Sequence, residues 1–473
     1  MPDLGGKAGV IMRTLCMAEC RRFLGQPLNL LVLGIYVGLL LLGALWALLQ
    51  ADQLRSEQMR REGVRAQALA QGLAPPLAAT LPAAAMQAFT LGRSQAGLAQ
   101  LSPAPGLVLS VSPFHYQPTA IAVSVESRHG DGRRSGVLDN PLLGSLGSLD
   151  LGLLISLLMP LAAIGLAAAS LAEHREQGLW RLVCCQSASP WLVLTAGMLI
   201  QALALGLPAL LICAVALLRD AGVQGWATAL LWGACLLCYA LFWSILVHLL
   251  GLLRLASGAS VMVALAAWLG LTFGLPAAAQ AWAAHQHPIP SRLGFVVELR
   301  QAQQQAEEAM PALLSAWYAR HPAWQPVRPQ APAWPVSFLP RFEQQDARLR
   351  AAAHAFIEQR VAQTRRLKEW AWAAPPLALW LAADQLAGIG PARYAGFMWA
   401  VDEHEAAWRG FFVPRIMSYR GLAQVEASAV PVFGGMPPPR LAAALPLLGA
   451  LALAVLGVGL IWSVAALRLA GRP

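Results

Sequence analysis

The chain has 473 residues, of which 57% are hydrophobic and only 12% are charged. This composition lies far from that of soluble proteins and predicts an integral membrane protein. The formal net charge of +10 comes almost entirely from arginine, and the basic residues are spread along the chain among acidic ones. Because nucleic-acid binding needs basic residues gathered on one face, we expect no nucleic-acid partner.

The N-terminal segment, residues 1–27, precedes the first apolar run and carries several basic side chains. Residues 10–23 predict an amphipathic helix that lies on the cytoplasmic surface of the membrane. The alternative for this segment is a frayed, charged terminus. In the helical interpretation, lipid headgroups contact Arg13, Arg21 and Arg22, and the acyl boundary contacts Ile11, Leu15 and Phe23.

Six later runs are apolar and long enough to cross about 30 Å of hydrocarbon, so they predict six transmembrane helices. They cover residues 28–49, 149–171, 191–218, 227–250, 256–278 and 441–467. Arginine or lysine residues lie before the first run, between the second and third runs, between the fourth and fifth runs, and after the last run. By the positive-inside rule these flanks are cytoplasmic, so we expect a multi-pass protein with both termini in the cytoplasm.

Two long polar segments then fall on the outer side of the membrane. The first, residues 50–148, opens with a polar helix through Arg65 and contains two alternating runs, residues 106–112 and 120–126, that predict short strands. The second, residues 285–440, predicts a helical domain, because its apolar residues recur at steps of three or four. Proline-rich breaks at Pro326 to Pro335, Pro375-Pro376 and Pro391 separate its helices. The expected fold is an all-α membrane protein with a mixed α/β external segment and a larger helical external domain.

The sequence offers no catalytic constellation. An ATP-binding P-loop needs a lysine after a glycine and before a hydroxyl residue, and neither Lys7 nor Lys368 fits. His404-Glu405 begins like a zinc-protease motif, but Trp408 occupies the position of the second imidazole, so a buried core histidine is the better interpretation. We expect no catalytic residues, and no ATP hydrolysis by this chain alone.

Metal and disulfide chemistry are also weakly supported. His285-x-His287 supplies two imidazoles next to a membrane boundary, which fits an interfacial polar pair better than a metal site, so we expect none. The seven cysteines lie outside both long polar segments and are expected to be small packing residues.

The centres of the apolar runs contain no Asp, Glu, Lys or Arg, and His248 is the nearest ionisable candidate. Carriers driven by an ion gradient usually keep such a group as a relay. We therefore expect the energy for any movement to enter from outside the bilayer.

The polar loop after the second run, residues 172–190, carries the most specific motif. It reads Glu173-His174-Arg175-Glu176-Gln177-Gly178-Leu179-Trp180-Arg181, preceded by Leu158-Met159-Pro160 and followed by Gln186-Ser187-Ala188-Ser189-Pro190. This loop resembles that of the ABC-2-type transporter permeases, whose members carry a Glu-Arg-Glu-x-Gly-Thr-Leu-Arg pattern and a Ser-x-Pro-x-Ser tail. Leu179 replaces the threonine of the pattern, and Met198 stands where a lysine often follows.

Other motifs are similar to those of the subgroup with large periplasmic insertions after the first and fifth transmembrane helices. They are Met86-Gln87-Ala88-Phe89-Thr90-Leu91-Gly92, Leu101-Ser102-Pro103, Asn140-Pro141-Leu142, Leu386-Ala387-Gly388-Ile389-Gly390 and Phe411-Phe412-Val413-Pro414-Arg415. The resemblance covers nearly the whole chain and implies a bacterial inner (plasma) membrane protein with two large periplasmic segments.

The resemblance also implies partners. In that family the loop is a coupling helix that rests on a separate ATPase subunit, which binds ATP and Mg²⁺, and two permease subunits form the membrane part. A mixed-charge rim with an apolar anchor suits such a contact, although a solvated turn is the alternative. Carried over by position, the contact set is Glu173, Arg175, Glu176, Gly178, Trp180 and Arg181.

Two functions follow from these expectations. The first is a permease subunit of an ATP-driven exporter, embedded in the lipid bilayer beside a second permease. The second is an ATP-driven mechanical scaffold that acts on a periplasmic or envelope partner through its external domain and transports nothing. A continuous substrate-sized cavity between the spans favours the first, and a tightly packed bundle with an exposed apolar patch outside favours the second.

Overall fold

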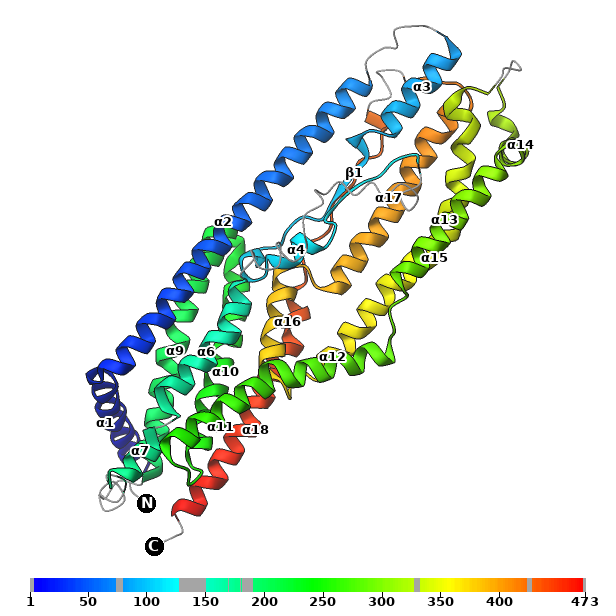
Figure 1. The fold of residues 1–473 in the computed structure, drawn as a ribbon. Helices are drawn as coiled ribbons and strands as arrows, with labels where there is room; N and C mark the ends of the chain where they lie inside the picture. The colour runs from blue at the N-terminus through cyan, green and yellow to red at the C-terminus, as the bar shows by residue number, and fades with distance from the viewer. Residues whose placement is uncertain are drawn as a thin grey trace.

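The computed structural model describes residues 4–73, 80–126, 150–168, 170–178, 180, 190–326, 332–422 and 428–470. The molecule is elongated and almost entirely helical (Figure 1). Long apolar helices form a bundle at one end, and a second body of helices extends from the opposite side of that bundle. The N- and C-terminal helices both reach the free end of the bundle, which we call the terminal end.

Five segments of the described chain are long and apolar enough to cross a membrane, which agrees with a multi-pass membrane protein. They are Pro27–Gly72, Leu151–Glu176, Pro190–Gly251, Ser257–Gln286 and Leu441–Ala465. The third of these contains two helices, α9 (Pro190–Ala221) and α10 (Trp226–Gly251), joined by the short helix η3 (Gly222–Gly225) and packed on each other. Six separate crossings therefore stay a prediction.

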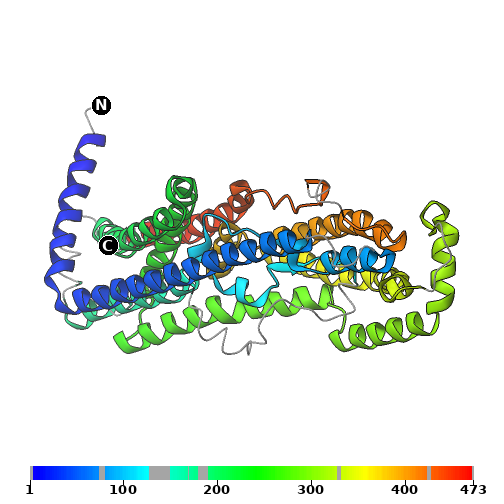
Figure 2. The same cartoon turned by 90° about the horizontal axis from the view of Figure 1, so that it is seen from above.

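The other helices of the bundle match the apolar runs of the sequence. They are α2 (Pro27–Gly72), α6 (Leu151–Ala167), α11 (Ser257–Leu269), α12 (Leu275–Gln286) and α18 (Leu445–Ala470), with a π-helical turn, η4 (Gly270–Gly274), between α11 and α12. Helix α1 (Leu4–Gly25) lies crosswise to α2 at the terminal end (Figure 2). The predicted helix over residues 10–23 is thus confirmed as a helix, while its position on the membrane surface stays a prediction.

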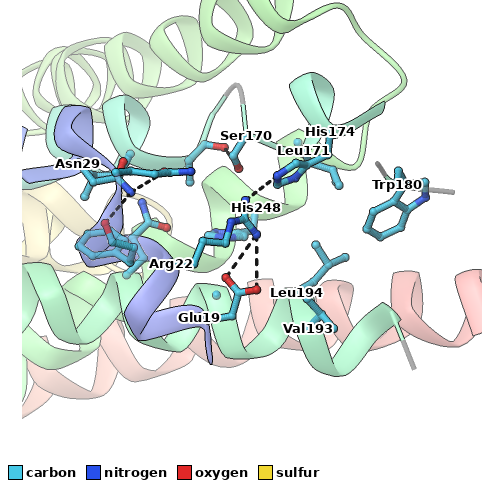
Figure 3. A pocket seen from close by; sticks show the side chains of 17 residues that line it. Glu19, Arg22, Asn29, Ser170, Leu171, His174, Trp180, Val193, Leu194 and His248 are labelled. Atoms are coloured by element: carbon cyan, nitrogen blue, oxygen red, sulfur yellow. Dashed lines mark hydrogen bonds and ion pairs between the residues drawn. The ribbon is translucent and has the colours of Figure 1, made fainter. Parts of the chain in front are cut away.

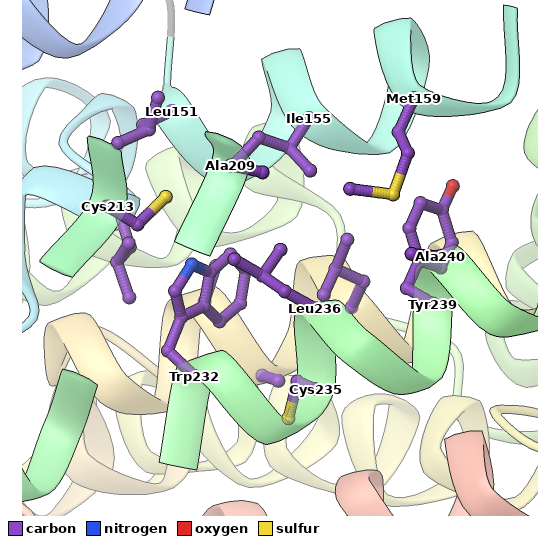
Figure 4. Close-up of a cluster of buried hydrophobic side chains, with 14 of the residues drawn as sticks. Leu151, Ile155, Met159, Ala209, Cys213, Trp232, Cys235, Leu236, Tyr239 and Ala240 are labelled. Atoms are coloured by element: carbon purple, nitrogen blue, oxygen red, sulfur yellow. The ribbon is translucent and has the colours of Figure 1, made fainter. Parts of the chain in front are cut away.

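The bundle has a core of large side chains that exclude water. Trp232, Tyr239 and Trp243 of α10 are fully buried, and Figure 4 shows the first two close to Ile155 and Met159 of α6. The Tyr239 hydroxyl donates a hydrogen bond to the backbone oxygen of a residue in α6 at 2.7 Å, which satisfies the one polar group of that ring. Such packing fills the middle of the bundle.

Helix α2 links the bundle to the second body. Its second half is polar, as the sequence predicts up to Arg65, and the helix continues to Gly72 (Figure 2). Arg55 donates two hydrogen bonds to the carboxylate of Asp220 at the end of α9, at 2.9 and 2.8 Å. Because the Asp220 side chain is only 1% exposed, this pair fixes α2 where it leaves the bundle.

The second body has its own hydrophobic core, built around Phe89, Phe397, Trp408 and Phe412. The Trp408 indole donates to the backbone oxygen of Gly92 at 2.9 Å, so the core also joins distant parts of the chain. Its helices are α3 (Leu81–Gly92), α13 (Arg292–Glu308), α14 (Met310–Arg320), α15 (Trp334–Glu369) and α17 (Pro391–Met417). Within the predicted range of residues 285–440, most described residues up to 417 are helical as predicted, whereas the described residues 418–422 and 428–440 form no α-helix.

The strand predictions are only half correct. A two-stranded antiparallel sheet pairs β1 (Leu98–Gln100) with β2 (Ala120–Ala122), so a strand does lie within residues 120–126. The strand predicted at residues 106–112 is wrong, because that stretch forms the 3₁₀ turn η2 (Leu107–Leu109) and the start of α4 (Ser112–Tyr116). The three residues of η2, Leu107, Val108 and Leu109, are all apolar and fully buried, so this part of the run is apolar on every side and does not alternate.

Helix α16 (Pro375–Ala387) belongs to the core of the bundle, although it lies between two helices of the second body along the chain. It packs against α6, α10, α18 and η2 (Figure 1). At Gly106 an added Cβ would lie 2.4 Å from the backbone oxygen of Leu386, so only glycine allows this approach. Together α16 and η2 cover the end of the bundle opposite the termini.

Candidate functional site

The loop singled out by its motif begins with a short helix, α7 (Ser170–Glu176), at the terminal end of the bundle (Figure 1). The helix ends because Gly178 adopts a left-handed conformation, with φ of 75°, and its N–H donates to the backbone oxygen of Arg175 at 3.1 Å. A glycine at this position is the usual way to end a helix, since other residues are strained there. The motif's glycine therefore has a local structural role.

Two charged residues of α7 bind the connection between α10 and α11. The Arg175 guanidinium donates to the backbone oxygens of Leu253 and Leu252, at 2.9 and 3.3 Å, where α10 ends. The Glu176 carboxylate accepts from the backbone N–H of Ser257 at 2.9 Å, where α11 begins. A cation at a helix C-terminus and an anion at a helix N-terminus both complement the partial charges of the unpaired backbone groups.

Two members of the predicted contact set already bind within the chain. They are Arg175 and Glu176, and Glu176 is also exposed at the terminal end, as are Glu173 and Gly178. Trp180 is half-buried, and Arg181 and Leu179 lie outside the described residues. Contact of this set with a partner stays a prediction.

A third contact joins α7 to α1. The Arg22 guanidinium donates to Nε2 of His174, and its Nη1 also lies 3.4 Å from the Glu19 carboxylate. An arginine has donors only, so His174 accepts through Nε2 and carries its proton on Nδ1 when neutral. Helix α7 consequently bonds to α1 on one side and to the α10–α11 connection on the other.

Next to this contact lies a cavity of about 400 Å³, the terminal cavity, shown in Figure 3. Helices α1, α6, α7, α9 and α10 contribute its walls, and Trp180 lines it as well. Its polar lining includes Glu19, Arg22, Gln201 and His248. In the sequence His248 stands out only as the nearest ionisable group to the spans, and the only signal of Gln201 is an amide inside an apolar run.

A second polar cluster lies at the opposite end of the bundle, where α16 packs. The Ser110 hydroxyl donates to the Asp384 carboxylate at 2.6 Å. Asp150 accepts from the backbone N–H groups of Val111 and Ser112, at 2.6 and 2.8 Å. Burial, together with the negative charge of Asp150, raises the pKa of Asp384 to about 7.

The remaining histidine candidates have structural surroundings. His404 is 7% exposed and packs near Trp408 and Phe433, and burial lowers its pKa. The core interpretation of His404 is confirmed. His285 and His287 end α12, and the backbone oxygen of His287 accepts from Gln363 of α15 at 2.7 Å. Among the described residues, no three His, Cys, Asp or Glu side chains gather in a way that would hold a metal ion.

Comparison with known proteins gives one match. A family described as a domain of unknown function (DUF3526) matches residues 292–434, which run from α13 past the end of α17. The match covers less than a third of the chain, and the family's description states no activity. No curated protein and no solved structure matches the chain.

Proposed function

We propose that the chain is the membrane-spanning permease subunit of an ABC-2-type transporter, working as an exporter and driven by a separate ATPase subunit. Long apolar helices and the resemblance of the α7 loop support this proposal. Neither lysine of the chain fits a P-loop, so ATP and Mg²⁺ would bind to the partner. The terminal end would face the cytoplasm, and the second body would face the periplasm.

The observation that carries the proposal is the set of bonds that α7 makes on both sides. Arg175 and Glu176 hold the end of α10 and the start of α11, and His174 holds Arg22 of α1. A force applied to α7 therefore reaches three other helices through direct hydrogen bonds. Closure of a pair of ATPase subunits would apply that force and turn it into a rigid-body movement of the spans.

The exposed face of α7 would then contact the ATPase, and Glu173 is its charged residue without an internal bond among those described. A second permease subunit would complete the membrane part. The segment Ser257–Gln286 offers a surface for it, because only 6% of its apolar window is buried within this chain. The lipid bilayer would cover the rest.

The test is co-expression of the tagged chain with each ABC ATPase subunit from the same genome that lacks transmembrane helices. The proposal predicts that one ATPase co-purifies with the chain and that Glu173→Arg weakens its retention about tenfold or more, as reversal of a contact charge does. Glu403→Arg, an exposed glutamate of α17, is the matched control and should leave retention unchanged. Equal retention in both variants would refute a contact through α7.

The packing favours a second candidate, an ATP-driven mechanical scaffold without cargo. Trp232, Tyr239 and Trp243 fill the middle of the bundle, and α16 covers one end of it. The continuous helix α2 would carry movement from the bundle to the second body, where an envelope partner would bind. Inside-out vesicles that contain the chain and its ATPase separate the two functions. ATP-dependent uptake of a cell metabolite, absent with an inactive ATPase, supports export, and hydrolysis with no uptake of any metabolite supports the scaffold.

A further inference from the structure

The C-terminal end of α15 lies against the bundle, although most of this helix belongs to the second body. Leu367 packs against α12, and the Gln363 amide donates to the backbone oxygen of His287 just beyond α12, at 2.7 Å. The chain then enters the core of the bundle at Ala371. The last two turns of α15 therefore lie beside the last turns of Ser257–Gln286, a segment long and apolar enough to cross a membrane.

The length of this segment indicates the depth of the contact in a membrane. Ser257–Gln286 has 30 residues. At 1.5 Å per residue it is about 45 Å long, which exceeds the thickness of the hydrocarbon layer, about 30 Å. When this segment crosses a membrane, its last turns must therefore reach the layer of lipid headgroups. Helix α12 forms these turns, and Figure 1 shows it where the bundle meets the second body.

Several large apolar side chains are exposed around this contact. Leu293 and Val297 lie four residues apart on one face of α13 and are 74% and 48% exposed. Trp282 of α12 and Trp372, just beyond α15, are exposed too, and Trp282 packs edge-on against Trp370 at 5.8 Å. Tryptophan is enriched at membrane interfaces, because its ring is apolar and its N–H bonds to headgroups or water. This combination is typical of a surface at the edge of a bilayer.

Two basic residues of α15 add positive charge at the same place. Arg365 and Lys368 are three residues apart and lie on one face of the helix. Neither makes a hydrogen bond or an ion pair with another described residue, whereas Arg366 is paired with Glu369 at 3.0 Å. Long basic side chains at the edge of a bilayer cover apolar surface with their carbon atoms and extend their charge to lipid phosphates. Arg365 and Lys368 thus complement anionic headgroups.

We propose that the end of α15 is seated in the headgroup layer of the membrane, on the side of the second body, and binds anionic phospholipids there. Arg365 and Lys368 bind the lipid phosphates, and the side chains of Trp282, Trp372 and Leu293 enter the lipid. This surface requires only that the chain crosses a membrane, and it depends on neither an ATPase nor a cargo. Because α15 is one helix from this end to the core of the second body, the membrane would also fix the orientation of that body.

A photoreactive amino acid at position 372 tests the contact in the full-length chain, reconstituted in nanodiscs of equal parts phosphatidylglycerol and phosphatidylcholine. Irradiation should give covalent phospholipid adducts from position 372 and none from position 334. Trp334 is the matched control, because it begins the same helix at the opposite end and is 53% exposed, against 59% for Trp372. The proposal is overturned by equal lipid adducts from both positions, by no lipid adduct from position 372, or by an adduct there with a second copy of the chain in place of lipid.

The composition of the adducts tests the role of the basic pair. Phosphatidylglycerol adducts from position 372 should exceed phosphatidylcholine adducts about fivefold, because basic side chains attract the lipid that carries a net negative charge. Arg365→Gln combined with Lys368→Gln should bring this ratio to about one. Arg348→Gln combined with Arg350→Gln removes two exposed arginines from the middle of the same helix and should keep the ratio. An unchanged ratio in the first double variant, or an equal loss in the second, would overturn the proposal.

Discussion

Replacing Asp384 by asparagine tests the packing of α16 against the bundle. Asparagine keeps the shape of aspartate and an oxygen that accepts from Ser110, but it cannot ionise. The surroundings of Asp384 disfavour its negative charge, because the half-buried side chain is largely desolvated by its neighbours and Asp150 is near. We therefore expect Asp384→Asn to stabilise the protein at pH values above the ordinary carboxyl pKa of 3.8, where the carboxyl group of the unfolded wild-type chain ionises.

The sign and size of the change in unfolding free energy follow from the pKa of Asp384. Burial raises the pKa of Asp384 from 3.8 to about 7, so the folded chain holds this proton more tightly than the unfolded chain does. The stability linked to this proton is complete below about pH 4 and is lost as the pH rises through about 7. Each unit of pKa difference corresponds to about 1.4 kcal/mol, which gives at most about 4 kcal/mol above pH 7. Residual access of the side chain to water reduces this value.

The assay is thermal unfolding of the purified chain in detergent, followed by tryptophan fluorescence from about pH 4 to about pH 8.5. The chain contains 17 tryptophans, so the signal is strong. The variant and wild type should unfold at the same temperature at the acidic end, and the variant at the higher temperature at the basic end. Asp52→Asn, at an exposed carboxylate, is the control. A constant difference at every pH, or a less stable variant at the basic end, would refute the reasoning.

Three further variants test contacts of the bundle, each by its unfolding temperature in detergent. Arg55→Met leaves the buried Asp220 carboxylate without its cation and should lower the free energy of unfolding by about 3–5 kcal/mol. A decrease no larger than that for breaking an exposed ion pair would contradict this expectation. Gly106→Ala forces a Cβ against a backbone oxygen 2.4 Å away and should cost about 1–3 kcal/mol, whereas Gly34→Ala, with open space around it, should cost little. Glu176→Gln removes the negative charge at the start of α11 and should lower the free energy of unfolding by about 0.5–1 kcal/mol. Amide exchange should become faster in the first turn of α11 and stay unchanged elsewhere.

Many of the helices can be predicted from residues that are neighbours in the sequence. Nearly all described residues of the six apolar runs lie in helices, because length and hydrophobicity suffice to identify a buried or lipid-facing helix. Helices α16 and α17 begin at Pro375 and Pro391, two of the predicted breaks, since proline is well tolerated in the first turn of a helix. These features depend on neighbours in the chain only.

The failures involve residues whose partners are distant. The run that contains η2 predicted a strand, but all three residues of η2 are buried, and α16 packs close to Gly106 from 280 residues further along the chain. The bonds of Arg175 and Glu176 to backbone groups about 80 residues away could not be predicted from the α7 motif either, while the six contact residues stay a prediction. Backbone oxygens and N–H groups have no sequence signature, so only the fold reveals which charges are already bonded.

The most direct test of the central claim places a photoreactive amino acid at position 173, on the exposed face of α7, in cells that express the chain with its candidate ATPases. The proposal predicts a covalent adduct with an ABC ATPase from position 173 and none from position 403 in α17. An adduct with that ATPase from position 403, or none from position 173 when the two proteins co-purify, would contradict it.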